Sequence, residues 1–183
     1  MIELITGPMG SGKSEALLTK LKMKMETKIP IVCFKPKTDT RTKGEIRSRN
    51  GMFHKAFEVE NFLEMVDMMI DYYQAGVTHF IIDEVQFMKH EGFEKFVIFT
   101  QTTNVSVYAA GLNQTSEMTA FKETAVFAMF ADSIVVLQGK CAYCGGNSKR
   151  TVCTIPKDGE VLIGDDVYEQ TCYACGEALR RKK

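Results

Sequence analysis

The sequence lacks the features that direct a chain to a membrane or to nucleic acid. Lysine plus arginine and aspartate plus glutamate each total 23, so the formal net charge is zero and no overall positive field attracts either partner. No apolar run approaches the roughly 20 residues that cross a bilayer, and the first residues lack the basic and long apolar regions of a secretory leader. We therefore expect a cytoplasmic protein with neither a membrane nor a nucleic-acid partner.

Histidine is scarce, and its three widely separated residues argue against a histidine-based metal site or catalytic triad. Cysteine occurs six times, but a reducing cytoplasm disfavours disulfides. Four of the six form two C-x2-C pairs separated by 27 residues, a pattern that suits one closed, structural zinc site. The predicted zinc ligands are Cys141, Cys144, Cys172 and Cys175. Cysteines without metal and a nucleic-acid-binding zinc ribbon are the alternatives.

The composition is typical of a globular protein, with 45% apolar and 25% charged residues among 183. Short apolar runs alternate with stretches of helical spacing, which predicts an α/β fold with a parallel sheet and helices on both faces. The predicted strands cover residues 2–6, 29–35, 78–84, 105–112 and 132–138, and the predicted helices cover 13–27, 61–76, 93–101 and 117–130. For the polar, basic residues 36–51, which show no clear period, we predict a long loop. Cysteines, glycines and short turns then replace this pattern, so we divide the chain into a main domain, residues 1–138, and a small module, residues 139–183.

The most specific motif is GPMGSGKS, residues 7–14, which matches the phosphate-binding pattern GxxxxGK[ST] in full. Glycines in such a loop let backbone N–H groups point at anionic oxygens, and the following helix contributes its positive end. Lys13 reaches the β- and γ-phosphates of a nucleotide, and the Ser14 hydroxyl coordinates Mg²⁺. The motif lies between a predicted strand and a predicted helix, as this mechanism requires. The predicted nucleotide-binding residues are Gly7, Pro8, Met9, Gly10, Ser11, Gly12, Lys13 and Ser14.

Two acids, Asp83 and Glu84, end the predicted strand at residues 78–84. Ligands of α/β sheets bind beyond the carboxyl ends of the strands, so both acids should face the phosphate-binding loop. One acid can assist Mg²⁺ while the other accepts a proton from the attacking group. ATPases that power movement carry the same pair, so the acids alone do not distinguish ATP hydrolysis from phosphoryl transfer.

With these parts in place, the chain resembles the type II thymidine kinase family over nearly its whole length. The resemblance rests on GPMGSGKS, KTDTR, IDEVQF, AAGL, the two C-x2-C pairs and IGDDVY, in that order. It implies a P-loop NTPase-type sheet and transfer of the γ-phosphoryl group of ATP to the 5′-hydroxyl of thymidine or deoxyuridine, with Mg²⁺ as the essential ion. It also implies a homotetramer.

The resemblance further implies roles for the residues around the phosphates. Glu84 is the general base near the 5′-hydroxyl, and Lys13 with the loop amides holds the donor phosphates. Ser14 and Asp83 serve Mg²⁺. The residues that the IDEVQF match assigns to the donor nucleotide are Asp83, Glu84, Val85 and Gln86.

For the acceptor, the resemblance implies a nucleoside pocket closed by a loop of the zinc module, residues 154–168, which carries Tyr168. Arg41, two positions after Asp39 in the KTDTR segment, helps to neutralise phosphate charge. The residues at family positions that line the pocket are Met9, Phe87, Leu112, Phe121 and Thr151. The residues whose backbone grips the pyrimidine are Val161, Leu162, Ile163 and Gly164.

The chain departs from the family pattern at Asn113, at Ser116 and in the segment SRNG, residues 48–51, but not in the phosphate motifs. A P-loop ATPase with a nucleic-acid-binding zinc ribbon is the second hypothesis, which the neutral charge and the missing aromatic-basic stripe oppose. A kinase acting on a nucleotide is the third. Its charged acceptor needs a cluster of arginines, and the chain offers only the group Arg41, Arg47 and Arg49.

Overall fold

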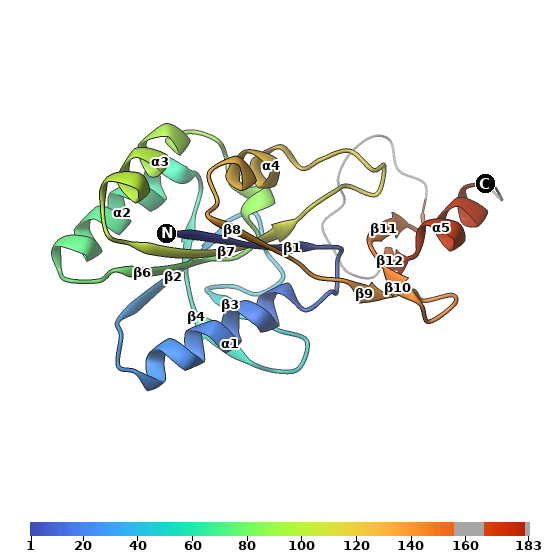
Figure 1. Ribbon diagram of the computed structural model, residues 1–183, viewed down its shortest axis with the longest axis horizontal. Helices are drawn as coiled ribbons and strands as arrows, with labels where there is room; N and C mark the ends of the chain where they lie inside the picture. Colours follow the sequence, from blue (N-terminus) through green and yellow to red (C-terminus); the bar gives the residue numbers. More distant parts are fainter. Residues whose placement is uncertain (156–166, 182–183) are drawn as a thin grey trace.

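The computed structural model of the chain describes residues 1–155 and 167–181. Its centre is a six-stranded sheet in which every pairing is parallel, with the order β5-β2-β6-β7-β1-β8 (Figure 1). The strands are β1 (Ile2–Gly7), β2 (Ile31–Pro36), β5 (Phe57–Val59), β6 (His79–Ile82), β7 (Ser106–Leu112) and β8 (Ser133–Val136). Because all six strands run the same way, the segments that follow β1, β2 and β6 all emerge at the carboxyl ends of the strands.

Helices cover both faces of the sheet, which confirms the predicted α/β fold (Figure 1). The helices are α1 (Lys13–Glu26), α2 (Phe62–Gln74), α3 (Phe93–Thr102) and α4 (Lys122–Met129). Helix α1 lies on one face, where its Leu17 packs in an apolar cluster with Ile46. Helices α2, α3 and α4 lie on the other face, where Phe62, Phe96 and Phe127 belong to a second, larger cluster.

Helix α2 shows how the sequence pattern produces one of these elements. Its first turn is capped by Asn61, whose side chain accepts a 2.8 Å hydrogen bond from the Glu64 N–H and so satisfies one free backbone donor. The side chains that recur at helical spacing face the sheet and are fully buried. They are Phe62, Met65, Val66 and Met69.

Three segments differ from the sequence prediction. The predicted loop 36–51 contains strand β3 (Glu45–Arg47), which pairs antiparallel with β4 (Phe53–Lys55), and β5 adds a parallel edge to the sheet. Each of these strands is three residues long, too short for a period-2 pattern to be recognised. The predicted helix 117–130 begins only at Lys122, because Thr115 and Thr119 close a tight turn with a 2.8 Å backbone hydrogen bond.

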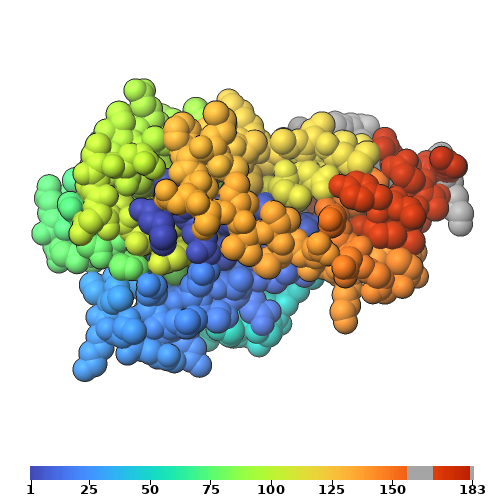
Figure 2. Space-filling view, in the orientation of Figure 1, coloured from blue at the N-terminus to red at the C-terminus, as the bar shows by residue number. Residues whose placement is uncertain are grey.

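Residues 139–155 and 167–181 form what we call the C-terminal module, at one end of the molecule (Figures 1 and 2). Its elements are β9 (Gly139–Lys140), β10 (Asn147–Ser148), β11 (Arg150–Cys153), β12 (Tyr168–Thr171) and α5 (Tyr173–Arg180). Two small antiparallel pairs, β9 with β10 and β11 with β12, replace the parallel sheet here. Among the described residues, no helix combines the length and apolar character needed to cross a membrane.

Candidate active site

A cleft of about 530 Å³ opens at the carboxyl ends of the parallel strands. The predicted site residues that line it are Met9, Gly10, Gly12, Lys13, Ser14, Asp39, Arg41, Asp83, Glu84, Phe87, Leu112, Phe121, Thr151 and Tyr168. The remaining predicted nucleotide-binding residues, which do not line it, are Gly7, Pro8, Ser11, Val85 and Gln86. Segments more than 100 residues apart in the sequence therefore meet around one cavity.

The phosphate-binding loop connects β1 to α1, as the motif predicts. Gly10 and Gly12 have φ angles of 71° and 87°, a backbone region that other residues rarely adopt. The Lys13 side chain is buried and its Nζ donates a 2.8 Å hydrogen bond to the Pro8 carbonyl. Burial lowers the pKa of Lys13 from its ordinary value, although the charges of Glu84 and Asp83 oppose this shift. Phosphate oxygens near Lys13 would favour its charged form in the same way.

Asp83 lies directly after β6 and is buried against the start of α1. Burial and the neighbouring charge of Glu84 raise the pKa of Asp83 to about 7, while a hydrogen bond from Ser14 opposes the rise. A carboxylate beside a hydroxyl is the oxygen-donor set that Mg²⁺ prefers in nucleotide sites, and a divalent cation there would favour ionised Asp83. Ser14 and Asp83 therefore fit a magnesium ion.

Glu84 is held in an uncommon backbone conformation at the base of the cleft. Its φ of 55° and ψ of 42° are left-handed, which costs about 1–2 kcal/mol for a residue other than glycine, and its N–H donates to Asp83 Oδ1 at 3.0 Å. Arg41 Nη2 donates to Glu84 Oε1, and Gln86 Nε2 donates to Glu84 Oε2. Hydrogen bonds on both oxygens fix the orientation of the carboxylate.

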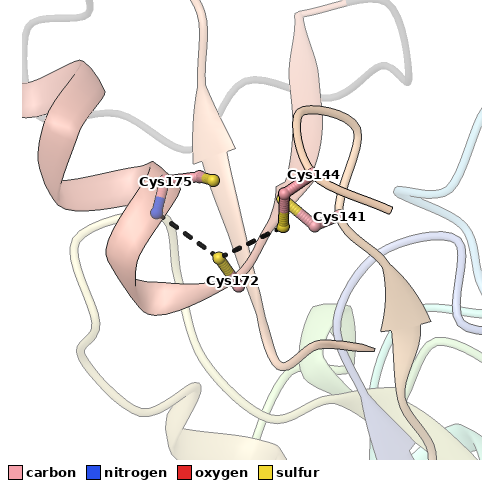
Figure 3. Close-up of side chains that lie close together, drawn as sticks. All are labelled: Cys141, Cys144, Cys172 and Cys175. Carbon is pink, nitrogen blue, oxygen red and sulfur yellow. Dashed lines mark hydrogen bonds between the residues drawn. The ribbon is translucent and has the colours of Figure 1, made fainter. Parts of the chain in front are cut away.

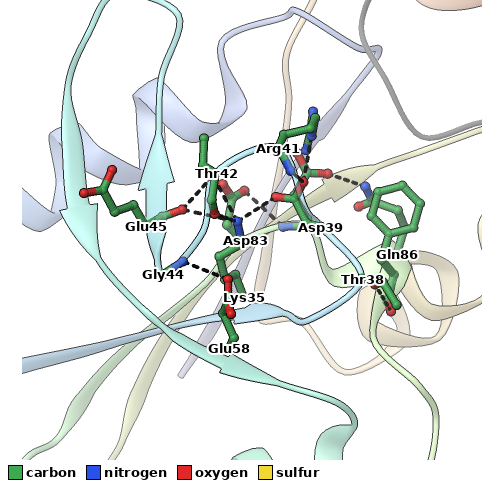
Figure 4. Close-up of polar contacts among 12 residues, drawn as sticks. Lys35, Thr38, Asp39, Arg41, Thr42, Gly44, Glu45, Glu58, Asp83 and Gln86 are labelled. Atoms are coloured by element: carbon green, nitrogen blue, oxygen red, sulfur yellow. Dashed lines mark hydrogen bonds and ion pairs between the residues drawn. The ribbon is translucent and has the colours of Figure 1, made fainter.

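Arg41 is fixed by acids on two sides (Figure 4). Its Nε donates to Asp39 Oδ1 at 2.7 Å, and Asp39 Oδ2 in turn lies 3.1 Å from the Nζ of buried Lys35. Burial alone would lower the pKa of Arg41, but the charges of Glu84 and Asp39 keep it above its ordinary value. The sequence led us to expect a basic side chain in a loop, whereas the structure shows a guanidinium paired with Glu84.

Gln86 and Val85 belong to the 3-10 helix η1 (Val85–Phe87), where both are buried behind the residues that line the cleft. Gln86 Oε1 accepts a 3.0 Å hydrogen bond from the Leu112 N–H, so one buried amide joins Glu84 to the end of β7. Val85 is completely buried in the larger apolar cluster. Neither residue lines the cleft, and their assignment to the donor nucleotide stays a prediction.

The opposite part of the cleft is apolar. The Phe87 and Phe121 rings meet edge to face with centroids 6.2 Å apart, and Leu112 lines the same space. Thr151 of β11 accepts a 3.0 Å hydrogen bond from the Met9 N–H, which brings the C-terminal module against the phosphate-binding loop. Aromatic and aliphatic walls with a few polar groups are typical of small-molecule pockets. The predicted contacts Val161, Leu162, Ile163 and Gly164 lie outside the described residues.

The sequence prediction did not assign several other residues that line the cleft. They are Glu15, Thr42, Arg47, Ser48, Arg49, Gly51, Gln114, Thr115 and Ser116. Residues 48–51 reach the cleft because they form the turn between β3 and β4. The dipeptide Asn50–Gly51 is typical of hairpin turns, and it is the feature of the sequence that could have predicted this turn. Residues 114–116 reach it through the tight turn that shortens α4.

The four predicted zinc ligands converge in the C-terminal module (Figure 3). Cys141 and Cys144 come from the turn between β9 and β10, and Cys172 and Cys175 from the start of α5. Their sulfur atoms lie within 4.8 Å of one another, with 3.8 Å between Cys144 Sγ and Cys172 Sγ. Four thiolates about 2.3 Å from a tetrahedral zinc ion stand about 3.8 Å apart, so the cluster fits zinc. All six cysteines are described and none forms a disulfide.

A parallel sheet with a complete phosphate-binding loop and an acidic pair in the same cleft defines a P-loop nucleotide-binding protein. The sequence model of the family described as "Thymidine kinase" matches residues 1–176. The chain is 35% identical over 185 residues to the thymidine kinase of Mycoplasma genitalium, which covers 98% of this chain and 84% of the relative. It is 33% identical to the thymidine kinase of Mesomycoplasma hyopneumoniae strain 7448, and the match covers 96% of this chain and 94% of that relative. The chain belongs to the thymidine kinase family.

Proposed function

We propose that this chain transfers the γ-phosphoryl group of ATP to the 5′-hydroxyl of thymidine or deoxyuridine, which gives the nucleoside monophosphate. The observation that carries the proposal is that one cleft combines the phosphate-binding loop, the Glu84 carboxylate and the apolar walls of Phe87 and Phe121. A hydrolase needs no apolar acceptor pocket beside its phosphate site. Membership of the thymidine kinase family supports the same reaction and the same acceptor.

The donor half of the cleft would bind ATP through backbone N–H groups of the loop and the Lys13 ammonium. Ser14 and Asp83 would hold Mg²⁺, which as a Lewis acid stabilises negative charge on phosphoryl oxygens when bound. Lys13 lines the same cleft as Ser14 and Asp83. The chain thus contributes positioning and electrostatic stabilisation, the two effects on which phosphoryl transfer mainly depends.

The acceptor half would place the 5′-hydroxyl at Glu84, which accepts its proton during transfer. The Gln86 and Arg41 hydrogen bonds orient Glu84, and the nucleoside hydroxyl would join or replace one of them. Arg41 released from Glu84 would remain anchored to Asp39 through its Nε. It would then present its other nitrogen atoms to the phosphate oxygens.

For the C-terminal module, we propose a structural zinc ion, because four cysteine ligands leave no open position for catalysis. We also propose that the module is a unit separate from the main domain, with the boundary between residues 138 and 139. The change there from the parallel sheet to short antiparallel pairs supports this division. We further propose a cytoplasmic location, where a reducing environment would keep these cysteines available to the metal.

We propose in addition that the protein assembles from four copies, as the family resemblance implies. The outer strand β8 supports self-association, because its Ile134, Val135 and Val136 side chains are 48%, 41% and 60% exposed. In Figure 2 the orange segment that includes β8 lies on the visible surface. An exposed apolar strand at a sheet edge is a ready surface for pairing.

The direct test is a panel of nucleosides and nucleoside monophosphates incubated with labelled ATP and Mg²⁺. We expect labelled monophosphate from thymidine and deoxyuridine, and at least 10²-fold less from Lys13→Ala, which removes a phosphate-binding charge. Label on a diphosphate would favour nucleotide kinase activity instead. ATP hydrolysis stimulated by nucleic acid, without nucleoside product, would contradict the proposal.

Glu84→Gln tests the proposed base within the same assay. Turnover should fall by about 10²-fold or more while ATP affinity stays near the wild-type value, because the amide keeps the size of the side chain but accepts no proton. Glu60→Gln is the matched control, since Glu60 pairs with Lys89 on the surface and does not line the cleft. Equal turnover of the two variants would remove Glu84 from this role.

A further inference from the structure

The first half of the phosphate-binding loop is enclosed by residues from the far end of the chain. A Cβ on Gly7 would collide with the Leu137 carbonyl oxygen, which follows β8. The Met9 N–H donates to Thr151 Oγ1 at 3.0 Å, and this bond spans 142 positions. Thus the segment that leads into the C-terminal module and the module itself both contact the loop before it reaches α1.

Gln170 of β12 makes the closest of these approaches. Its amide stands between two glycines, with Nε2 against Gly10 of the loop and Oε1 against Gly139 of β9, and a Cβ on either glycine would overlap the amide. Gln170 Oε1 is buried and accepts no hydrogen bond from the described residues. Packing between the two glycines therefore fixes the side chain.

The backbone of Gln170 is tied to the cysteine cluster. Its carbonyl accepts a 2.9 Å hydrogen bond from the Ala142 N–H, in the turn that carries Cys141 and Cys144. Two positions after Gln170 in the chain comes Cys172, the third ligand. A metal bound by the four thiolates would therefore fix both the turn and the strand that carry Gln170 to the loop.

We propose that the C-terminal module is a positioning element for the donor phosphates, with Gln170 and Thr151 as its positioning residues. The proposal rests on the proposed function, in which residues 7–14 bind ATP. The loop can hold phosphates only when its N–H groups converge, and the two contacts restrain the half of the loop that α1 does not anchor. The module would then serve the donor as well as cover the acceptor.

The test measures ATP binding to zinc-loaded protein in the absence of nucleoside. Gln170→Ala should weaken ATP affinity about tenfold, because part of the ordering of the loop must then occur on binding. Thymidine affinity, measured without ATP, should change less than twofold, since the Gln170 side chain does not line the main cleft. A side chain that merely stabilised the module would weaken both ligands or neither.

Gly139→Ala provides a second variant that leaves Gln170 in place. The new methyl group must displace the flexible amide from its position between the glycines, so ATP affinity should again fall. In a Gln170→Ala background the same change should have little further effect, because no amide remains to be displaced. This non-additivity identifies the contact between positions 139 and 170 as the cause.

Thr151→Val should weaken ATP binding through loss of the acceptor for the Met9 N–H, and Thr151→Ser should restore it. Tyr143→Phe is the matched control, because it removes a hydrogen bond to Glu169 within the module that does not involve the loop. Zinc content and far-UV circular dichroism confirm that each variant is folded. Wild-type ATP affinity in both Gln170→Ala and Gly139→Ala would overturn the proposal, as would equal weakening by Tyr143→Phe.

The proposed function and this inference can fail independently. If the wild type binds ATP but phosphorylates no thymidine, the proposed function fails. The ATP affinities of the Gln170→Ala and Gly139→Ala variants, relative to the wild type, still decide the inference. If thymidine is phosphorylated while Gln170→Ala and Gly139→Ala both bind ATP as the wild type does, the inference alone fails.

Discussion

At the scale of the residue, Asp39 shows how one buried carboxylate organises the cleft. It pairs with Arg41, which lines the cleft, and with Lys35, whose side chain is only 1% exposed. Burial alone would raise the pKa of Asp39, but the hydrogen bonds and charges of Arg41 and Lys35 lower it below its ordinary value. The acid therefore contributes stability only while it is ionised.

Asp39→Asn should lower the free energy of unfolding by about 3–5 kcal/mol at pH 7, because it leaves the Lys35 charge buried without its partner. A carboxyl group whose pKa is lowered by folding stabilises the protein above its unfolded pKa of about 3.9, and this contribution is lost as the pH falls through the lower, folded pKa. The difference between wild type and variant should thus be constant above about pH 5 and shrink below pH 4.

Urea unfolding between pH 3 and pH 7, within the range in which the wild type remains folded, measures this difference. Asp67→Asn is the control, since Asp67 forms an exposed pair with Lys95 and should change stability by less than about 1 kcal/mol at any pH. A difference for Asp39→Asn that does not depend on pH would contradict the assigned charge pairing.

Residue contacts also mark what the sequence could not predict. The Gly7–Ser14 motif and the two C-x2-C pairs are local patterns, and each was recognisable without the fold. The pairing of Arg41 with Glu84 joins side chains 43 positions apart, so it depends on the order of strands β2 and β6 in the sheet. No periodicity in the sequence encodes such a contact.

At the scale of the element, long amphipathic segments were predictable and short ones were not. Helix α2 has four buried side chains at helical spacing, and both its existence and its extent followed from the sequence. Strands β3, β4 and β5 have three residues each, and their pairing depends on a turn and on the rest of the sheet. The side chains near residues 48–51 were therefore missed as part of the cleft.

The C-terminal module should depend on metal for its structure. Its strands have two to four residues, too little to bury a stable core, so we expect about one zinc ion per chain and local unfolding when it is removed. Metal analysis and hydrogen exchange before and after chelation measure both effects.

Cys144→Ser should lose zinc, whereas Cys153→Ser should keep it, because Cys153 lies outside the four-cysteine cluster. Metal-free protein with undiminished amide protection in β11, β12 and α5 would contradict a structural role for zinc. Retention of metal by Cys144→Ser and loss by Cys153→Ser would contradict the ligand assignment.

At the scale of the whole molecule, the described residues of one copy leave Ile134, Val135 and Val136 of the edge strand β8 between 41% and 60% exposed. Val136→Lys places a charge on this edge and should shift the proposed tetramer to smaller species, because a buried lysine opposes strand pairing between copies. Light scattering after size-exclusion chromatography measures the change. Ile98→Lys is the control, since Ile98 is similarly exposed, at 55%, but belongs to α3. A wild-type monomer at micromolar concentration would contradict the assembly proposed here.

Because β1 lies between β7 and β8, the residues that pair with it are synthesised long after it. Residues 2–7 are synthesised before their strand partners at residues 107–112 and 133–136, and the loop that follows them meets Thr151 and Gln170. At about 5–20 residues per second, Gln170 is synthesised roughly 8 to 33 s after Gly7. The phosphate-binding loop is thus synthesised well before the residues that contact it, so a nascent chain that ends before Gln170 lacks that contact.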